Sequence, residues 1–161
     1  FPREGIIFRD ITPILASPKA MRHVTRKLAD FIEDQNATLV LAPEARGFLF
    51  GLPAAVEADV AFAPVREPGK LPRTVVEETY DLEYGTDTLQ IHADAIKPGD
   101  RVVIVDDLLA TGGTVQAIRH MAEKCGAEVV GTAFVVELDD LKGRDRLEDV
   151  PILSLVHYEG E

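Results

Sequence analysis

The sequence predicts an α/β domain with a mainly parallel five-stranded sheet flanked by helices. Five aliphatic runs are typical of strands that are buried on both faces, as in a parallel sheet. These runs are 37–42, 60–65, 102–105, 128–136 and 151–156. Helical patterns separate several of the runs, which is the alternation that builds α/β domains. A cation-rich loop and a hairpin pattern between the second and third runs predict an insertion above the sheet.

Size and composition indicate one globular domain covering residues 1–161. A chain of 161 residues can bury a substantial core. We find no apolar stretch long enough to cross a membrane and no signal-peptide pattern. Cys125 is the single cysteine, so no internal disulfide is expected and a cytoplasmic location is the default. The net charge of −11 argues against nucleic acid or an anionic membrane as a partner.

The N-terminal region combines an extended segment with a helix. Pro2 and Gly5 disfavour a helix in residues 1–10. Ser17 and Pro18 suit the N-cap and first position of a helix, and apolar residues recur at helical spacing up to about Gln35. We expect this helix to be part of the scaffold.

The aliphatic run 37–42 leads into a turn at residues 43–47. The helix expected at 48–58 contains a Gly-Leu-Pro sequence at 51–53, which predicts an interruption. Arg46 therefore lies at a strand-to-helix turn. It either pairs locally with Glu44 or grips an anion through its guanidinium group.

The insertion consists of a loop and a hairpin within residues 66–92. Residues 66–73 contain three cations, two prolines and a glycine, which suits either a solvated mobile loop or a lid over a substrate. Segments 74–84 and 88–92 flank a turn at 85–87. The acidic residues of the hairpin alternate with apolar ones, so most should face water, and the residues alone mark Glu83 as an ordinary hairpin carboxylate.

The organising stretch begins with the buried strand 102–105. Asp106 and Asp107 follow it, at the carboxyl end of a strand, where open α/β sheets bind ligands. Residues 110–114 form a loop of two glycines and two threonines before a helix at 115–125, which Thr111 or Thr114 can cap. Such a loop can direct backbone N–H groups at a single phosphate, while the two carboxylates suit the hydroxyls of a sugar. The alternative is a core strand, a turn and a capped helix without a ligand.

The remaining pattern completes the scaffold. Residues 97–100 form a turn before the central strand, and Gly126 suits the position just after the last helix. Residues 141–149 have the mixed charges of a surface turn.

The sequence from Val105 to Thr114, VDDLLATGGT, resembles the phosphoribosyl pyrophosphate motif of the type I phosphoribosyltransferases. The particular residues of this motif are similar to those of the adenine phosphoribosyltransferases, and the similarity extends over nearly the whole chain. The resemblance implies the type I phosphoribosyltransferase fold, in which residues 1–10 form a hood and residues 66–92 form the flexible loop and hairpin. It also implies transfer of a 5-phosphoribosyl group to adenine, giving AMP and pyrophosphate in purine salvage.

The resemblance implies a role for each part of the phosphoribosyl pyrophosphate site. The 5′-phosphate would bind to Ala110, Thr111, Gly112, Gly113 and Thr114. Asp106 and Asp107 would engage the ribose hydroxyls, which requires the strand to end at Asp106, because successive strand side chains point to opposite faces. Arg46, Arg66 and Lys70 would bind the pyrophosphate together with substrate-bound Mg²⁺, with no metal ligand expected from the protein itself. Asp107 and Arg46 would thus be catalytic.

The resemblance further implies an adenine site and a strained turn. The base would meet Ile7, Phe8, Arg9 and Leu108, with Phe8 stacked on the ring, and Glu83 would be the acid/base group. A non-proline cis peptide is expected between Glu44 and Ala45, which costs about 3 kcal/mol. Glu67 departs from the family pattern, since a basic residue is more usual there, and it weakens the positive field of the loop. Because the whole chain is acidic, local cations and Mg²⁺ should reverse the field at the site.

Two other functions stay open at this point. One is transfer to a 6-oxopurine such as hypoxanthine or guanine, which some relatives of this general shape use, although the Phe8 segment and Glu83-Tyr84 favour adenine. A non-catalytic regulator that senses phosphoribosyl pyrophosphate is the other, although such proteins generally add a basic nucleic-acid-binding domain. The family also implies a homodimer.

Overall fold

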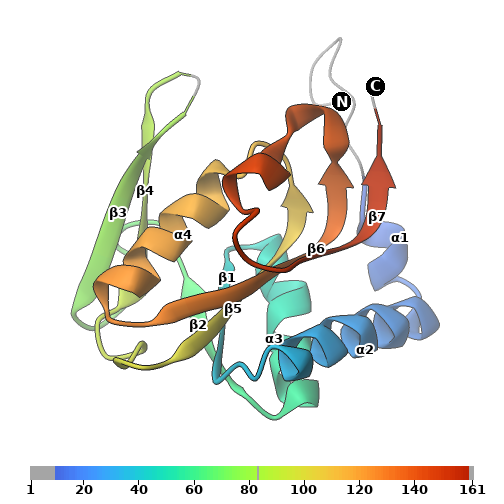
Figure 1. Cartoon of the computed structure of the whole chain (residues 1–161), viewed down its shortest axis with the longest axis horizontal. Coiled ribbons are helices and arrows are strands. Elements are labelled where there is room, and N and C mark those ends of the chain that lie inside the picture. Colours follow the sequence, from blue (N-terminus) through green and yellow to red (C-terminus); the bar gives the residue numbers. More distant parts are fainter. Residues whose placement is uncertain (1–9, 83, 160–161) are drawn as a thin grey trace.

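A parallel five-stranded sheet forms the centre of the molecule (Figure 1). The computed structural model describes residues 10–82 and 84–159. The strands are β1 (Leu39–Pro43), β2 (Ala61–Val65), β5 (Arg101–Leu109), β6 (Glu128–Leu138) and β7 (Ile152–Tyr158). They lie in the order β2-β1-β5-β6-β7, and every neighbouring pair is parallel. The predicted sheet is confirmed, and the organising stretch lies on its central strand.

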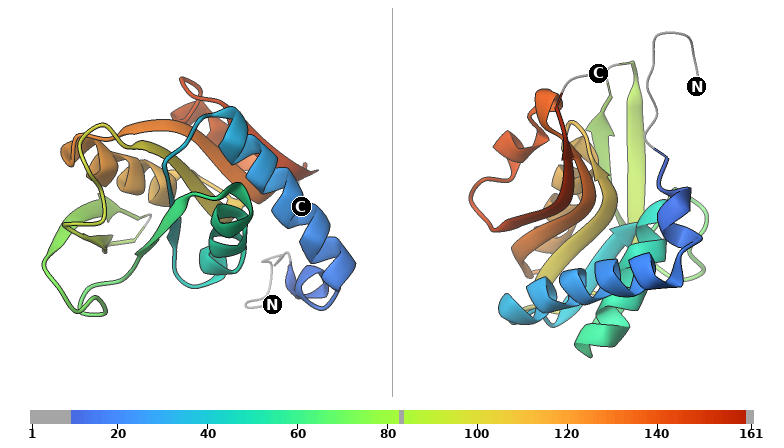
Figure 2. Two further views of the ribbon diagram at one scale, coloured as in Figure 1. Left: turned by 90° about the horizontal axis from the view of Figure 1, so that it is seen from below. Right: turned by 90° about the vertical axis from the view of Figure 1, so that its right-hand side faces the viewer.

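Helices cover both faces of the sheet, and a separate hairpin adds to one of them (Figures 1 and 2). The helices are α1 (Thr12–Leu15), α2 (Pro18–Asp34), α3 (Arg46–Ala58) and α4 (Gly113–Lys124). One face packs against α2 and α3 and the other against α4. The hairpin consists of β3 (Val75–Asp81) and β4 (Thr86–His92), and its inner side joins the core beneath α4.

Two apolar cores lie on opposite faces of the sheet because neighbouring strand residues point in opposite directions. Val102 and Ile104 of β5 pack into the core that contains α4 and the hairpin. Val103 and Val105 pack into the core that contains α2 and α3. All four valine and isoleucine side chains are fully buried, as expected for a central parallel strand.

Helix boundaries agree with the sequence in part. The Ser17 side chain caps α2 as predicted, accepting a hydrogen bond from the Ala20 N–H at 3.2 Å. The predicted interruption of α3 is wrong, since the helix runs continuously through Pro53. Helix α4 begins at Gly113 rather than at Val115, and Gly126 has the expected left-handed conformation beyond its end, with φ of 85°.

The segment after β6 differs from the expected surface turn. It forms two short 3-10 helices, η1 (Asp139–Leu141) and η2 (Gly143–Arg146), followed by the fully buried Leu147. The segment is charged, yet it is anchored in the core. Within the described residues, every helix is too short or too polar to span a bilayer.

Candidate active site

Two adjoining cavities open at the carboxyl ends of β1 and β5. Each encloses about 200 Å³, and they share Arg46, Asp106, Asp107 and Thr114 in their walls. The first cavity extends from these residues toward the turn after β1 and the hairpin. The second extends along the loop that starts α4. The sheet therefore delivers the two predicted loops to one place, as the parallel order of its strands requires.

The loop at residues 110–114 lines the second cavity as predicted. Gly112 is the N-cap of α4, with φ of 86°, and no side chain caps the helix. The prediction that Thr111 or Thr114 caps α4 is thus wrong. Because the first N–H groups of a helix have no partner within it, this start of α4 offers hydrogen-bond donors and a positive dipole end to an anion.

Asp106 and Asp107 face the same cavities although β5 continues through both of them to Leu109. The expectation that the strand must end at Asp106 is therefore wrong. Regular alternation would place Ile104 and Leu108 on one face, yet Leu108 packs with the opposite core and Leu109 joins the core of Ile104. The alternation shifts by one position at the acid pair, which lets both carboxylates reach one site.

The acid pair is unusual in its electrostatics. The Asp107 N–H donates to Asp106 Oδ1 at 2.8 Å. Burial of Asp106, with the Asp107 carboxyl group beside it, raises the pKa of Asp106 well above its ordinary value. Asp106 Oδ1 would lie 3.1 Å from a Cβ atom at Gly47, so the close approach of the turn to the carboxylate favours glycine there.

Arg46 begins α3 and connects the turn after β1 to the acid pair. Its Nε lies 3.0 Å from Asp107 Oδ2, and the Asp107 side chain is only 7% exposed whereas that of Arg46 is 44% exposed. The peptide bond between Glu44 and Ala45 is cis, which confirms the prediction for this turn. The half-exposed guanidinium group is thus held by a buried carboxylate at the mouth of the first cavity.

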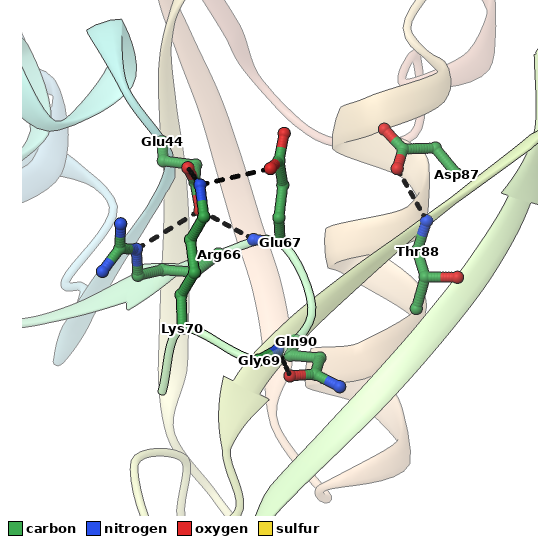
Figure 3. Close-up of polar contacts among 8 residues, drawn as sticks. All are labelled: Glu44, Arg66, Glu67, Gly69, Lys70, Asp87, Thr88 and Gln90. Carbon is green, nitrogen blue, oxygen red and sulfur yellow. Dashed lines mark hydrogen bonds and ion pairs between the residues drawn. The ribbon is translucent and has the colours of Figure 1, made fainter. Parts of the chain in front are cut away.

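Glu44 pairs with two of the three cations of the loop at residues 66–73 (Figure 3). Lys70 Nζ lies 2.7 Å from Glu44 Oε2, Arg66 Nε lies 3.3 Å from Glu44 Oε1, and the Glu67 N–H donates to the same oxygen at 2.7 Å. Burial opposes ionisation of Glu44, but the Lys70 and Glu67 hydrogen bonds hold its pKa below the ordinary value. Arg66 and Lys70 therefore lie next to the first cavity without lining it.

The described lining of the first cavity is acidic. Its carboxylates are Glu44, Glu67, Asp87, Asp106 and Asp107, against the single guanidinium group of Arg46. Lys70 also lies 3.2 Å from Glu67, so two carboxylates share its charge. We expected local cations to make the electrostatic field at the site positive, but the lining residues of the first cavity do not do so in this arrangement.

The hairpin contributes two side chains that the sequence analysis missed. Tyr80 and Asp87 form a cross-strand pair and both line the first cavity. The Tyr80 hydroxyl lies 3.3 Å from Thr114 Oγ1 and donates to Asp87 Oδ2 at 3.4 Å, and its burial raises its pKa. Strand periodicity was the available signal. Tyr80 lies on the same face of β3 as Val76, and Asp87 lies on the same face of β4 as Leu89, and both Val76 and Leu89 pack in the core.

Comparison with known proteins agrees with this geometry. A model of the phosphoribosyl transferase domain matches residues 10–156. An adenine phosphoribosyltransferase from Methanococcus maripaludis is 55% identical over 159 residues, covering 99% of this chain and 92% of that protein.

The chain belongs to the adenine phosphoribosyltransferases.

Solved structures of adenine phosphoribosyltransferases share the fold. That from Thermoanaerobacter pseudethanolicus has a TM-score of 0.93 at 50% identity and covers 98% of this chain and 91% of its own. That from Saccharomyces cerevisiae, in complex with adenine and an imino-altritol bisphosphate, has a TM-score of 0.90 at 39% identity, with 96% and 90% covered. The type I phosphoribosyltransferase fold predicted from the sequence is confirmed.

The structure places most, but not all, of the site residues expected for an adenine phosphoribosyltransferase. It brings together Arg46, Asp106, Asp107, Leu108 and the whole loop at 110–114. Arg66 and Lys70 form ion pairs with Glu44 at the edge of the first cavity. The predicted adenine contacts Ile7, Phe8 and Arg9 and the predicted acid/base residue Glu83 lie outside the described residues.

Proposed function

We propose that this chain transfers the 5-phosphoribosyl group of phosphoribosyl pyrophosphate to adenine, producing AMP and pyrophosphate in purine salvage. The observation that carries the proposal is the junction of the two cavities at Arg46, Asp106, Asp107 and Thr114. An anion-binding helix start lies on one side of this junction, and the Glu44–Arg46 turn with the loop cations lies on the other. A sugar with a phosphate at one end and a diphosphate at the other suits this arrangement. The names of the relatives support adenine as the acceptor.

The phosphoribosyl end binds to the second cavity. Backbone N–H groups of Ala110, Thr111, Gly112 and Gly113, together with Thr114, hold the 5′-phosphate at the positive end of α4. Asp106 and Asp107 accept hydrogen bonds from the ribose hydroxyls. The ion pair with Arg46 orients the Asp107 carboxylate for this task.

The diphosphate end binds to the first cavity. Arg46 supplies a planar fork of N–H donors that matches phosphate oxygens. Arg66 and Lys70 leave Glu44 or share it when the diphosphate arrives, because both ion pairs are partly solvated. These groups stabilise the negative charge that grows on the leaving pyrophosphate.

Substrate-bound Mg²⁺ fits the first cavity by its chemistry. Mg²⁺ prefers oxygen ligands and is usually held by one or two carboxylates together with substrate phosphates. The carboxylates of Asp106 and Asp107 line the cavity and would face an ion carried by the diphosphate. The bound ion would neutralise diphosphate charge in a site whose own lining is acidic.

In the reaction, a purine nitrogen forms a bond to the anomeric carbon of the ribose as the bond from that carbon to the pyrophosphate oxygen breaks. Positive charge develops on the sugar in a ribosyl-cation-like transition state, so the nearby carboxylates are placed to stabilise it. Leu108 forms an apolar wall against the base, and Ile7, Phe8 and Arg9 supply the other base contacts. Glu83 accepts the proton that the purine nitrogen loses. Alignment of the reactants supplies much of the remaining rate.

We further propose a homodimeric enzyme of the cytoplasm, with residues 1–161 forming one catalytic domain. Leu49, Leu52 and Val56 form an exposed apolar stripe along α3, with 42%, 47% and 70% of their surfaces accessible. Their helical spacing places them on one side of the helix. Such a stripe supports association with a second copy of the chain, which light scattering of the purified protein tests directly.

The decisive test is formation of AMP by the intact protein from adenine, phosphoribosyl pyrophosphate and MgCl₂. Adenine should be converted, and hypoxanthine and guanine should neither be converted nor compete at equal concentration. Efficient conversion of hypoxanthine or guanine would show that the acceptor is a 6-oxopurine and not adenine. Absence of turnover with all three bases, despite binding of phosphoribosyl pyrophosphate, would favour a regulator.

A further inference from the structure

The segment that follows β6 lies directly against the phosphate loop. Gly143, in η2, is buried, and a Cβ atom there would overlap the carbonyl oxygen of Ala110. The same atom would lie 2.9 Å from Leu109 Cδ1 and 3.1 Å from the nitrogen of Gly112. A Cβ atom on Gly112 would in turn lie 2.9 Å from the Gly143 carbonyl oxygen. Two backbone segments more than thirty residues apart in sequence therefore touch with no room for a side chain between them.

Steric contact, not backbone conformation, is the reason for glycine at this position. Gly143 is absent from the residues with positive φ, whereas Gly112 has φ of 86°. An alanine at 143 is thus compatible with the local backbone but not with the neighbouring loop. Because the crowded atoms are backbone atoms of Ala110 and Gly112, the loop and η2 must separate to admit a methyl group.

Ion pairs and a buried leucine hold the segment that contains Gly143 in place. We call residues 139–149 the brace. Arg144 donates to Glu137 Oε1 at 2.8 Å and to Oε2 at 3.2 Å, and Ser154 of β7 donates to Glu137 Oε1 at 2.6 Å. Glu137 is almost fully buried, which makes this charge-assisted contact strong.

The other end of the brace is attached to α4. Arg119 forms a two-pronged ion pair with Asp149, at 2.7 and 2.6 Å, and Leu147 is fully buried in the core beneath α4. Arg146 donates to the Gln116 side chain at 3.1 Å. The brace therefore joins the sheet to α4 and passes over the loop that starts this helix.

We propose that the brace sets the position of the phosphate loop, and that Gly143 is its positioning residue for the sugar-phosphate end of the substrate. This inference rests on the proposed function, in which residues 110–114 bind the 5′-phosphate. Gly143 itself touches no substrate. It acts because the N–H groups of Ala110 and Gly112 must lie where the phosphate oxygens arrive, and displacement of such donors by about 1 Å can cost up to 100-fold in rate.

The test compares two anionic probes on the intact Gly143→Ala protein. Ribose 5-phosphate carries only the sugar-phosphate end, and pyrophosphate carries only the leaving group. Isothermal titration should show an affinity for ribose 5-phosphate that is lower by at least about tenfold, with pyrophosphate affinity changed less than about twofold. An unchanged affinity for ribose 5-phosphate, or an equal loss for both probes, overturns the proposal.

Gly131→Ala is the matched control for steric damage away from the loop. A Cβ atom at Gly131 of β6 would lie 2.9 Å from the Phe31 ring, so this variant also crowds the interior. It should lower thermal stability and leave both affinities unchanged. A loss of ribose 5-phosphate affinity in this control equal to that of Gly143→Ala also overturns the proposal.

Arg144→Lys carries the same test if Gly143→Ala does not fold. It adds no atoms against the loop and keeps the charge, but it cannot reproduce both contacts to Glu137. A smaller selective loss of ribose 5-phosphate affinity supports the brace. Equal losses of ribose 5-phosphate and pyrophosphate affinity, or no loss, overturn it.

Wild-type protein that binds ribose 5-phosphate but makes no AMP would overturn the proposed function alone. Wild-type protein that makes AMP, together with a Gly143→Ala variant that keeps full affinity, would overturn the brace alone.

Discussion

Arg46 Nε lies 3.0 Å from Asp107 Oδ2 and joins the start of α3 to the end of the central strand. The arginine comes from the turn that we assign to the diphosphate, and the aspartate from the pair that we assign to the ribose. Each group orients the other before a substrate arrives. Pre-organisation of this kind lowers the cost of placing charges during the reaction.

Asp107→Asn should lower kcat/KM for phosphoribosyl pyrophosphate about 10- to 100-fold, because hydrogen bonds to a charged group are worth about 1.5–3 kcal/mol. The change keeps the shape of the side chain but removes the charge that orients Arg46 and attracts the ribose hydroxyls. Steady-state AMP formation measures the effect. Asp30→Asn, which removes an exposed carboxylate of α2 paired with Arg26, is the control and should change the rate less than about twofold. Full activity of Asp107→Asn would remove this residue from the mechanism.

Tyr80→Phe should produce a smaller loss. The hydroxyl contacts to Thr114 and Asp87 are long, 3.3 and 3.4 Å, so we expect a stability loss of roughly 0.5–1 kcal/mol. The KM for phosphoribosyl pyrophosphate should rise by up to about fivefold, because Thr114 loses a neighbour that orients its hydroxyl.

Thr79→Val provides the control for Tyr80→Phe on the same hairpin. It removes a 2.8 Å hydrogen bond between Thr79 and Thr88 on the side of β3 opposite to Tyr80. This variant should affect stability only. An equal rise in KM in both variants would show that hairpin stability, and not the Tyr80–Thr114 contact, determines substrate affinity.

Local sequence patterns were sufficient for the sheet and for the two principal loops. The aliphatic runs identify the five strands because parallel strands are buried on both faces. The residues of VDDLLATGGT and the Glu44–Arg46 turn are contiguous in sequence, so their placement at strand ends follows from the fold class alone. The shift of side-chain alternation at Asp106 and Asp107 could not be predicted in this way. The order of apolar and acidic residues does not show where a strand keeps its backbone hydrogen bonds while its side chains change faces.

Long-range packing accounts for the residues that the sequence analysis missed. Tyr80 and Asp87 reach the cavity because the hairpin docks beneath α4, which no local pattern specifies. Gly143 lies in a charged segment that resembles a surface turn until its contact with Ala110 and Gly112 is known. Pro53 was expected to interrupt α3, yet the neighbouring core contacts of this helix outweigh its local preference.

Glu67→Gln should increase the affinity for phosphoribosyl pyrophosphate. Glu67 Oε2 lies 3.2 Å from Lys70 Nζ, so it competes with the diphosphate for this cation. Exposed ion pairs are worth about 0.2–1 kcal/mol, which predicts a KM lower by up to about fivefold at low ionic strength. The advantage should shrink at high salt because screening weakens charge interactions at the surface.

Glu57→Gln removes the same unit of charge from the surface of α3 and controls for the net charge of the protein. If both variants lower KM equally, the effect comes from the overall acidity and not from the contact with Lys70. An increase in KM for Glu67→Gln would instead assign this carboxylate a favourable role, such as facing the metal carried by the substrate.

Asp106→Asn should stabilise the free protein at high pH. Burial and the neighbouring Asp107 carboxyl group raise the pKa of Asp106 in the folded state above its value in the unfolded chain. The unfolded chain therefore releases this proton first, and the free energy of unfolding falls as the pH rises through the raised pKa. Asparagine resembles the protonated acid and carries no such dependence. Urea unfolding from pH 4 to pH 8 should show the variant more stable than the wild type at pH 8, with the difference narrowing toward pH 4.

The opposite sign is expected for Asp94→Asn, which makes it a useful control for the pH series. The hydrogen bond from Arg73 lowers the pKa of Asp94, so its contribution is present above the ordinary carboxyl pKa and is lost as the pH falls. This pair is exposed, and its contribution should therefore be small. If Asp106→Asn were instead less stable than the wild type at pH 8, the ionised carboxylate would be stabilising in the folded state. In that case the electrostatic attraction of Arg46 would outweigh burial, and Asp106 would be ionised before substrate binds.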